Sequence, residues 1–133
     1  MPIGFVESLL WLSLNVYHES RGEPEIGQLA VAHVTLNRAL EDNKSIADVI
    51  LAPRQFSWTF QKKSYAPLEI NPLQESLRVA LKAMTTPDFT KGSTFYHHVD
   101  VAPGWAAGKA YIGRYGSHKF YRQGDTPISA SAF

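Results

Sequence analysis

Hydrophobic residues recur at helical spacing through the first twenty positions of the chain. The positions three or four residues apart are Phe5, Leu9, Leu12, Val16 and Ser20, and Leu10, Leu14 and Tyr17 widen the same face. This spacing predicts a first helix with one buried face. Gly22 and Pro24 follow directly, and both residue types interrupt helices. We therefore expect the helix to end in a tight, charged turn at residues 19–24.

The same periodicity predicts three more helices. The first of them opens at Pro24-Glu25, where an acidic first turn suits the helix dipole, and it extends to Leu40. The residues that recur at helical spacing along it are Ile26, Leu29, Ala30, His33, Val34 and Asn37. A short helix spans residues 46–51, with Ser45 as its N-cap. The last has Asn71 as cap and Pro72 at its first position. It should end near residues 86–87 and bury Leu73, Leu77, Ala80, Leu81 and Met84.

The remaining segments lack helical periodicity. Residues 54–71 are expected to form a loop, whereas residues 94–97 and 119–122 are short aromatic runs with strand propensity. Helices first and strands last favour an α+β fold, mainly helical, with a small antiparallel hairpin or sheet. A chain of 133 residues is long enough for one domain with its own core. We assign that single domain to residues 1–133.

Composition and charge narrow the classes of partner. The chain is 44% hydrophobic and 19% charged, with a net charge of +1 and no basic stripe, so we expect no nucleic-acid partner. No apolar run reaches the roughly eighteen residues of a membrane span. There is no cysteine, which excludes disulfides, thiol nucleophiles and thiolate metal sites. The apolar residues 5–16 lack the basic start and the cleavage site of a signal peptide.

Glu19 is the leading candidate for chemistry because it stands where the apolar helix meets the charged turn. A carboxyl group half-buried at such an edge has a raised pKa and suits general acid catalysis of glycosidic bond cleavage. The alternative is a helix-terminal Glu that is solvated or paired with Arg21. Glu23 is the second carboxylate, and catalytic pairs lie about 5 to 9 Å apart, but a cap or loop salt bridge is the favoured role for Glu23.

Several aromatic and polar residues suit a sugar-binding groove. Trp58 and Trp105 lie in non-periodic segments, and aromatic planes stack on the apolar faces of sugar rings. The polar residues near them in sequence, which complete the candidate substrate-binding set, are Gln55, Ser57, Tyr96 and His97. Packing beneath a loop is the alternative for either tryptophan.

The five histidines do not match a metal site. His18, His33, His97, His98 and His118 show none of the compact zinc spacings. Adjacent His97 and His98 on a strand would point to opposite faces, so at most one of them serves a given site. We therefore expect no metal and no other cofactor.

Five motifs together resemble the spore-cortex-lytic (SleB-type) cell wall hydrolases. The first is Tyr17-His18-Glu19-Ser20-Arg21-Gly22-Glu23-Pro24, where that family has roughly Tyr-Gly-Glu-Ala-Arg-Gly-Glu-Pro. The others are Gly27-Gln28-Leu29-Ala30-Val31-Ala32 with Leu36-Asn37-Arg38, then Gln55-Phe56-Ser57-Trp58, Phe95-Tyr96-His97 through Pro103-Gly104-Trp105, and Gly116-Ser117-His118-Lys119-Phe120-Tyr121. The resemblance covers about residues 8 to 122. Departures include His18 for Gly, Ser20 for Ala, and Ser117 for Asn.

The resemblance implies a lysozyme-like α+β domain that acts on peptidoglycan glycan strands. Its usual chemistry is lytic transglycosylation between N-acetylmuramic acid and N-acetylglucosamine, with the first Glu of the opening motif, here Glu19, as single acid and base. In this hypothesis Gln55, Ser57, Tyr96 and His97 orient the sugar. Three alternatives stay open: a hydrolytic muramidase that uses Glu23, a non-catalytic glycan-binding domain, and a metal-dependent amidase.

The absence of an export signal suits a phage lysis protein that stays in the cytoplasm until it is released to the cell wall. The same absence is equally compatible with a domain trimmed from a larger enzyme or with secretion by another route. We expect the chain to act as a monomer.

Overall fold

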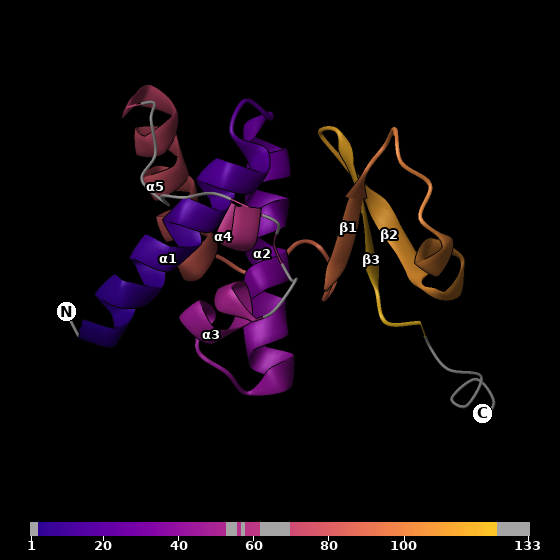
Figure 1. Cartoon of the computed structure of the whole chain (residues 1–133), viewed down its shortest axis with the longest axis horizontal. Helices are drawn as coiled ribbons and strands as arrows, with labels where there is room; N and C mark the ends of the chain where they lie inside the picture. The colour runs from indigo at the N-terminus through magenta and orange to yellow at the C-terminus, as the bar shows by residue number, and fades with distance from the viewer. Residues whose placement is uncertain (1–2, 53–55, 57, 62–69, 125–133) are drawn as a thin grey trace.

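The computed structural model describes residues 3–52, 56, 58–61 and 70–124. A helical body precedes a small sheet along the chain (Figure 1). The helices are α1 (Ile3–Ser20), α2 (Glu25–Asp42), α3 (Ile46–Leu51), the single turn α4 (Trp58–Gln61) and α5 (Ile70–Thr85). No helix of the described residues is long and apolar enough to cross a membrane. The predicted mainly helical α+β fold is confirmed.

Local signals predicted most helix ends correctly. The Ser45 side chain caps α3 by accepting a hydrogen bond from the backbone N–H of Asp48 at 3.0 Å. Asn71 was predicted to cap α5, and this is wrong because α5 already begins at Ile70. Pro72 is still tolerated there, because the N–H groups of the first helical turn have no intrahelical partner to lose. The single turn α4 lies within the segment predicted to be a loop.

Three antiparallel strands form the sheet, in the order β1 (Phe95–His98), β3 (His118–Arg122), β2 (Ala110–Tyr115). A short 3-10 helix, η1 (Gly104–Gly108), precedes β2. The two aromatic runs predicted as strands correspond to β1 and β3, which pair directly. β2 was not predicted, because its register shifts between Tyr111 and Gly113 and the pattern of alternation is lost at such a bulge.

The main core lies between the helices of the body. Its buried residues are Leu12, Val16, Ala32, Ile46, Ile50, Phe56, Trp58, Val79, Ala80 and Ala83. Two predicted core positions are wrong: Leu10 is 53% and Leu81 43% exposed. The face that α5 buries is instead Ser76, Val79, Ala80 and Ala83. A helix that packs on one side only has one buried stripe, and a leucine one position outside that stripe stays in contact with water.

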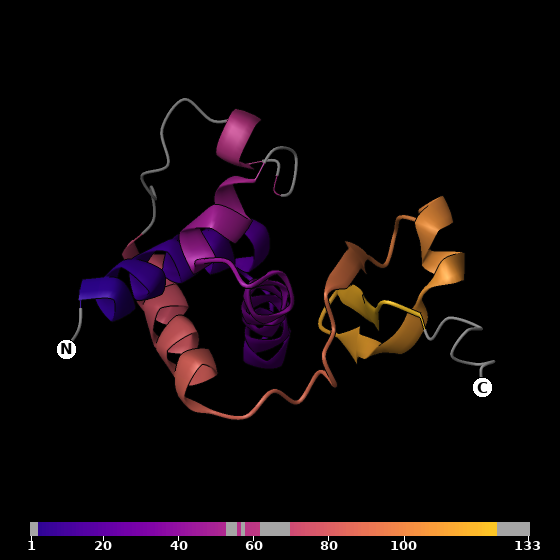
Figure 2. The ribbon, with the colours of Figure 1, turned by 90° about the horizontal axis from the view of Figure 1, so that it is seen from below.

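Helix α2 is buried on two sides because it lies between the helical body and the sheet (Figure 2). A second, smaller cluster joins Ala30, Val31 and Val34 of α2 to Phe120 of β3. An unbroken run of buried residues, 30–35, is what a helix covered on both sides requires. The sheet is therefore held directly against the central helix of the body.

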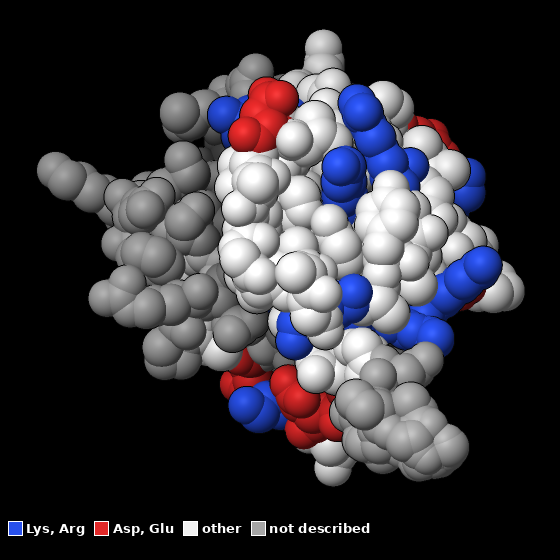
Figure 3. Space-filling view, turned by 90° about the vertical axis from the view of Figure 1, so that its right-hand side faces the viewer, with Lys and Arg blue, Asp and Glu red and all other residues white. Residues whose placement is uncertain are grey.

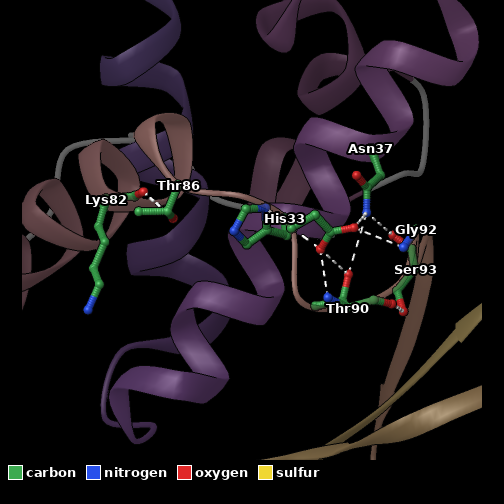
Figure 4. A network of polar contacts seen from close by, with 8 residues as sticks. His33, Asn37, Lys82, Thr86, Thr90, Gly92 and Ser93 are labelled. Carbon is green, nitrogen blue, oxygen red and sulfur yellow. Dashed lines mark hydrogen bonds and ion pairs between the residues drawn. The ribbon is translucent and has the colours of Figure 1, made fainter.

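The segment between α5 and β1 is fixed to α2 by a polar network around Asp88 (Figure 4). The Asp88 carboxylate accepts hydrogen bonds from the backbone N–H and hydroxyl of Thr90, from the Gly92 N–H at 2.8 Å and from the Asn37 amide at 3.1 Å. The same Asn37 amide donates to the Ser93 carbonyl at 2.9 Å. These bonds set where the chain enters β1, and hence where the sheet faces the body.

Replacing Asp88 with Ala should lower the free energy of unfolding by about 2 kcal/mol at neutral pH, because buried Thr90 and the partly buried N–H groups of Gly92 and Asn37 lose their acceptor. Burial alone would raise the pKa of Asp88, but its hydrogen bonds with Thr90, Gly92 and Asn37 outweigh burial and lower it. The carboxylate therefore stabilises the fold above its unfolded pKa, near 4, and this contribution disappears as the pH falls through the lowered folded value. Urea unfolding followed by circular dichroism at several pH values measures both effects.

The matched control is Asp100→Ala, since the Asp100 side chain is 85% exposed. We expect this control to unfold like the wild type. Equal stability of the Asp88→Ala chain and the wild type at pH 7 would contradict the prediction.

Candidate active site

Glu19 is the penultimate residue of α1, at the junction of the helical body and the sheet. The helix ends after Ser20, and Gly22 then adopts φ +89°, a left-handed conformation that glycine accepts without a steric penalty. The side chain of Glu19 is half-buried rather than pointing into bulk water. The predicted position at the edge of an apolar helix is thus the observed one.

Tyr96 of β1 binds the carboxyl group of Glu19 directly. Its hydroxyl donates a hydrogen bond to Glu19 Oε1, although the two residues are 77 apart in sequence. The Tyr96 ring packs on Phe120 and meets His118 edge-on, with centroid separations of 5.5 and 5.3 Å. The sheet thus presents a phenol, held by its aromatic neighbours, to the end of α1.

Burial raises the pKa of Glu19, while the hydrogen bond from Tyr96 and the charge of Arg38 act in the opposite direction. The net shift is upward, so the carboxyl group keeps its proton to a higher pH than a solvated glutamate does. Burial and the adjacent Glu19 carboxyl also raise the pKa of Tyr96 well above its usual range, so the phenol remains a donor. The pair has the properties of a general acid with a fixed orienting group.

Arg38 of α2 is the cation of this site. Its Nε donates to the Thr94 carbonyl at 2.7 Å, immediately before β1, and its guanidinium lies 5.2 Å from the centre of the Phe56 ring. Burial lowers the pKa of Arg38, against the opposing effect of Tyr96 and Glu19, and a guanidinium stays charged under such a shift. Arg38 therefore joins the body to the sheet and places a positive charge near both Glu19 and Tyr96.

Glu23 is used by the structure as a clamp on the turn between β2 and β3. Its Oε1 accepts a hydrogen bond from the Ser117 N–H at 2.7 Å. Gly116, at φ +62°, lies so close that an added Cβ would clash with the same oxygen. This arrangement agrees with the favoured interpretation of Glu23 as a cap, here of a β-turn rather than of a helix.

The Gly27-Gln28 motif has a structural role next to this clamp. A Cβ on Gly27 would lie 3.3 Å from the Tyr115 carbonyl oxygen, so glycine lets α2 approach the β2–β3 turn closely. The Gln28 amide donates to the Glu23 carbonyl at 2.9 Å. Together these contacts hold the turn after Glu19 in place.

The predicted substrate-binding residues that the structure describes do not share one face of the molecule. Gln55 and Ser57 lie outside the described residues. Trp58 is only 3% exposed; its indole N–H donates to the Asn15 side-chain oxygen at 2.8 Å, and its ring stacks on His18. This placement matches the alternative of packing in the core, and we correct the expectation of a Trp58 ring that lines the groove.

His97 and Trp105 lie on the face of the sheet opposite Tyr96. His97 neighbours Tyr96 on β1, so their side chains point to opposite faces. The His97 ring stacks on Tyr121 and meets Trp105, with centroid separations of 5.3 and 5.6 Å. Tyr96, on the inner face, is the predicted binding residue whose hydroxyl donates a hydrogen bond to Glu19.

Sequence reasoning missed two residues of this site, Arg38 and His118. Both belong to motifs that carried the family resemblance, Leu36-Asn37-Arg38 and Gly116-Ser117-His118, but no role was assigned to them. His118 is buried beside Tyr96, and burial lowers its pKa in spite of nearby Glu23, so its imidazole is neutral at neutral pH. Among the residues that the structure describes, no group of three or more His, Asp or Glu side chains is arranged to hold a metal ion.

Known proteins are similar to this chain in sequence and in fold. Residues 22–121 match the model of a family described as cell wall hydrolase. A spore cortex-lytic enzyme of Halalkalibacterium halodurans is 34% identical over 126 residues, which cover 90% of this chain and 36% of that protein. A spore cortex-lytic enzyme of Bacillus subtilis is 33% identical over 124 residues, which cover 90% of this chain and 39% of that protein. The chain thus spans well under half the length of these curated relatives.

Two solved structures match nearly the whole chain. One is described as the catalytic domain of the germination-specific lytic transglycosylase SleB of Bacillus anthracis; it has a TM-score of 0.77 and 29% identity, covering 92% of this chain and all of that one. The other, the catalytic domain of the Bacillus cereus SleB protein, has a TM-score of 0.75 and 31% identity, covering 92% and 95%.

Proposed function

The chain belongs to the cell wall hydrolase family, and on that premise we propose that it cleaves peptidoglycan by lytic transglycosylation with Glu19 as single acid and base. The bond broken is the β-1,4 link between N-acetylmuramic acid and N-acetylglucosamine. The observation that carries the proposal is the half-buried Glu19 carboxyl, bound by Tyr96 and placed near Arg38. The likeness to catalytic domains of a lytic transglycosylase supports the reaction type.

The reaction uses one carboxyl group twice. Protonated Glu19 gives its proton to the glycosidic oxygen as the bond from that oxygen to the anomeric carbon breaks. The C6 hydroxyl of the muramic acid then attacks its own anomeric carbon, and the Glu19 carboxylate takes the hydroxyl proton. The product is a 1,6-anhydro sugar. Because the nucleophile is a hydroxyl group of the substrate itself, the enzyme does not have to bind and activate a water molecule.

Tyr96 and Arg38 prepare Glu19 for both steps. The Tyr96 hydroxyl occupies Oε1, which leaves the transferable proton to Oε2. Once that proton has left, the same hydrogen bond and the Arg38 charge stabilise the carboxylate. The two neighbours thus limit the upward pKa shift, so that the group can release a proton as well as hold one.

The position of Glu23 supports a single-carboxylate mechanism over a hydrolytic muramidase. A muramidase of this kind needs a second carboxylate that faces the scissile bond. The Glu23 carboxylate instead accepts the Ser117 N–H and packs against Gly116. If Glu23 activated water, the Ser117 N–H in the β2–β3 turn would lose its hydrogen-bond acceptor.

Mass spectrometry of muropeptides released from purified sacculi tests the proposed reaction. We expect anhydro-muramic acid ends, lighter by one water than hydrolytic ends and unchanged by borohydride reduction. Reducing ends would indicate a muramidase, and cleavage of the peptide stem that a chelator abolishes would indicate a metal-dependent amidase. Binding without any product would favour a glycan-binding domain. Each of these three results contradicts the proposal.

A further inference from the structure

The sheet has two faces with different surroundings. Tyr96, His118 and Phe120 point toward Glu19 and α2. Because side chains alternate along a strand and paired residues share a face, the neighbouring residues form the opposite, outer face. We define this outer face by Phe95 and His97 of β1, Tyr111 and Arg114 of β2, and Lys119 and Tyr121 of β3.

Aromatic rings cover much of the outer face. Trp105 of η1 lies over it, with its ring centre 5.7 Å from Phe95, 5.6 Å from His97 and 5.5 Å from Tyr121. Tyr111 adds a further ring 5.4 Å from Tyr121. Trp105 is 40% and Tyr111 56% exposed to solvent. These two rings are large apolar surfaces that the fold leaves exposed rather than burying in either core cluster.

The charges on the outer face are of one sign. Lys109 places its ammonium 4.4 Å from the centre of the Phe95 ring, and Arg114 and Lys119 are cross-strand partners. No Asp or Glu occurs in β1, β2, β3 or η1. The side of the molecule that carries the sheet shows Lys and Arg among uncharged atoms, with the acidic side chains toward its margins (Figure 3). The surface thus combines aromatic planes with cations.

We propose that the outer face of the sheet is a second, non-catalytic binding surface for the glycan strands of peptidoglycan. The apolar faces of sugar rings stack on exposed Trp and Tyr, and Lys and Arg match the carboxylates of the peptide stems. The proposal rests on the proposed function, because peptidoglycan is chosen as the anionic glycan on that ground. A strand bound here lies on the opposite side of the sheet from Glu19, so it holds the enzyme on the polymer while another strand is cut.

The test is co-sedimentation with insoluble sacculi in a Glu19→Gln background, where cleavage does not remove the ligand. Adding Tyr111→Ala and Lys119→Glu should weaken binding about tenfold, as expected for losing a stacking ring and reversing a charge. The matched control is Lys44→Glu, an exposed lysine in the turn between α2 and α3 with the same change of charge. Circular dichroism melting verifies that each variant is folded, and Arg114→Glu replaces Lys119→Glu if the latter unfolds.

The outcomes separate this inference from the proposed function. If the wild type releases anhydro-muropeptides but the outer-face variant binds sacculi like the control, the inference is wrong and the function stands. If binding falls tenfold while the wild type cleaves nothing, the surface stands and the function fails. Equally strong, variant-sensitive binding to vesicles of anionic lipid would assign the outer face to a membrane and overturn the inference.

Discussion

Replacing Glu19 with Gln should reduce the release of anhydro-muropeptides about a thousandfold, the middle of the range that a general acid and base contributes. The amide keeps the size of the side chain but has no proton to give to the glycosidic oxygen. It also accepts no proton from the C6 hydroxyl, so both steps fail together. Product release from purified sacculi, measured by mass spectrometry, gives the rate.

Glu7→Gln is the matched control for this experiment. Glu7 lies on the same helix, α1, but is exposed near its beginning, so the same chemical change there should leave the rate unaltered. Both variants should melt within a few degrees of the wild type. A Glu19→Gln chain that retains more than about a tenth of the activity would exclude Glu19 as the proton donor.

Periodicity predicted the helices well because the information for a helix is local. The ends of α1 and α3 follow from Gly22 and from the Ser45 cap, both close in sequence to what they terminate or begin. The errors at Leu10 and Leu81 have a common origin. Each leucine lies at the margin of an apolar stripe, and only the position of the neighbouring helices decides whether it is covered.

The candidate site was predictable only where it depends on local sequence. Glu19 could be singled out because it stands at a helix end before a tight turn, whereas its contact with Tyr96 joins residues 77 apart. Alternation along β1 predicts that His97 and Tyr96 separate, but not which of them faces the helices. Likewise, nothing near Trp58 in sequence indicates that Asn15, on α1, accepts its indole N–H.

The motifs that carried the resemblance divide between chemistry and support. Asn37 and Arg38 hold the chain that enters β1, through Ser93 and Thr94. Glu23 and Gly116 hold the opposite end of the sheet. A short motif does not distinguish a residue that contacts substrate from one that positions the residue that does.

Replacing Tyr96 with Phe should reduce cleavage about a hundredfold, the loss expected when a catalytic group is misplaced by roughly 1 Å. The ring remains packed on Phe120, so the fold is kept, but Glu19 Oε1 loses its donor. The pH profile should change in a defined direction. The Tyr96 hydrogen bond lowers the pKa of Glu19 against the effect of burial, so its loss raises that pKa further.

The sign of this change distinguishes orientation of Glu19 from simple packing. The reaction begins from protonated Glu19, so kcat/KM falls as the pH rises through the pKa of the free enzyme. In the Tyr96→Phe chain this alkaline limb should move to higher pH even though the maximum rate is lower. Tyr111→Phe, at an exposed tyrosine on the other face of the sheet, should leave the limb in place. An unshifted limb in the Tyr96→Phe chain would mean that the Tyr96 hydroxyl does not control the proton that Glu19 transfers.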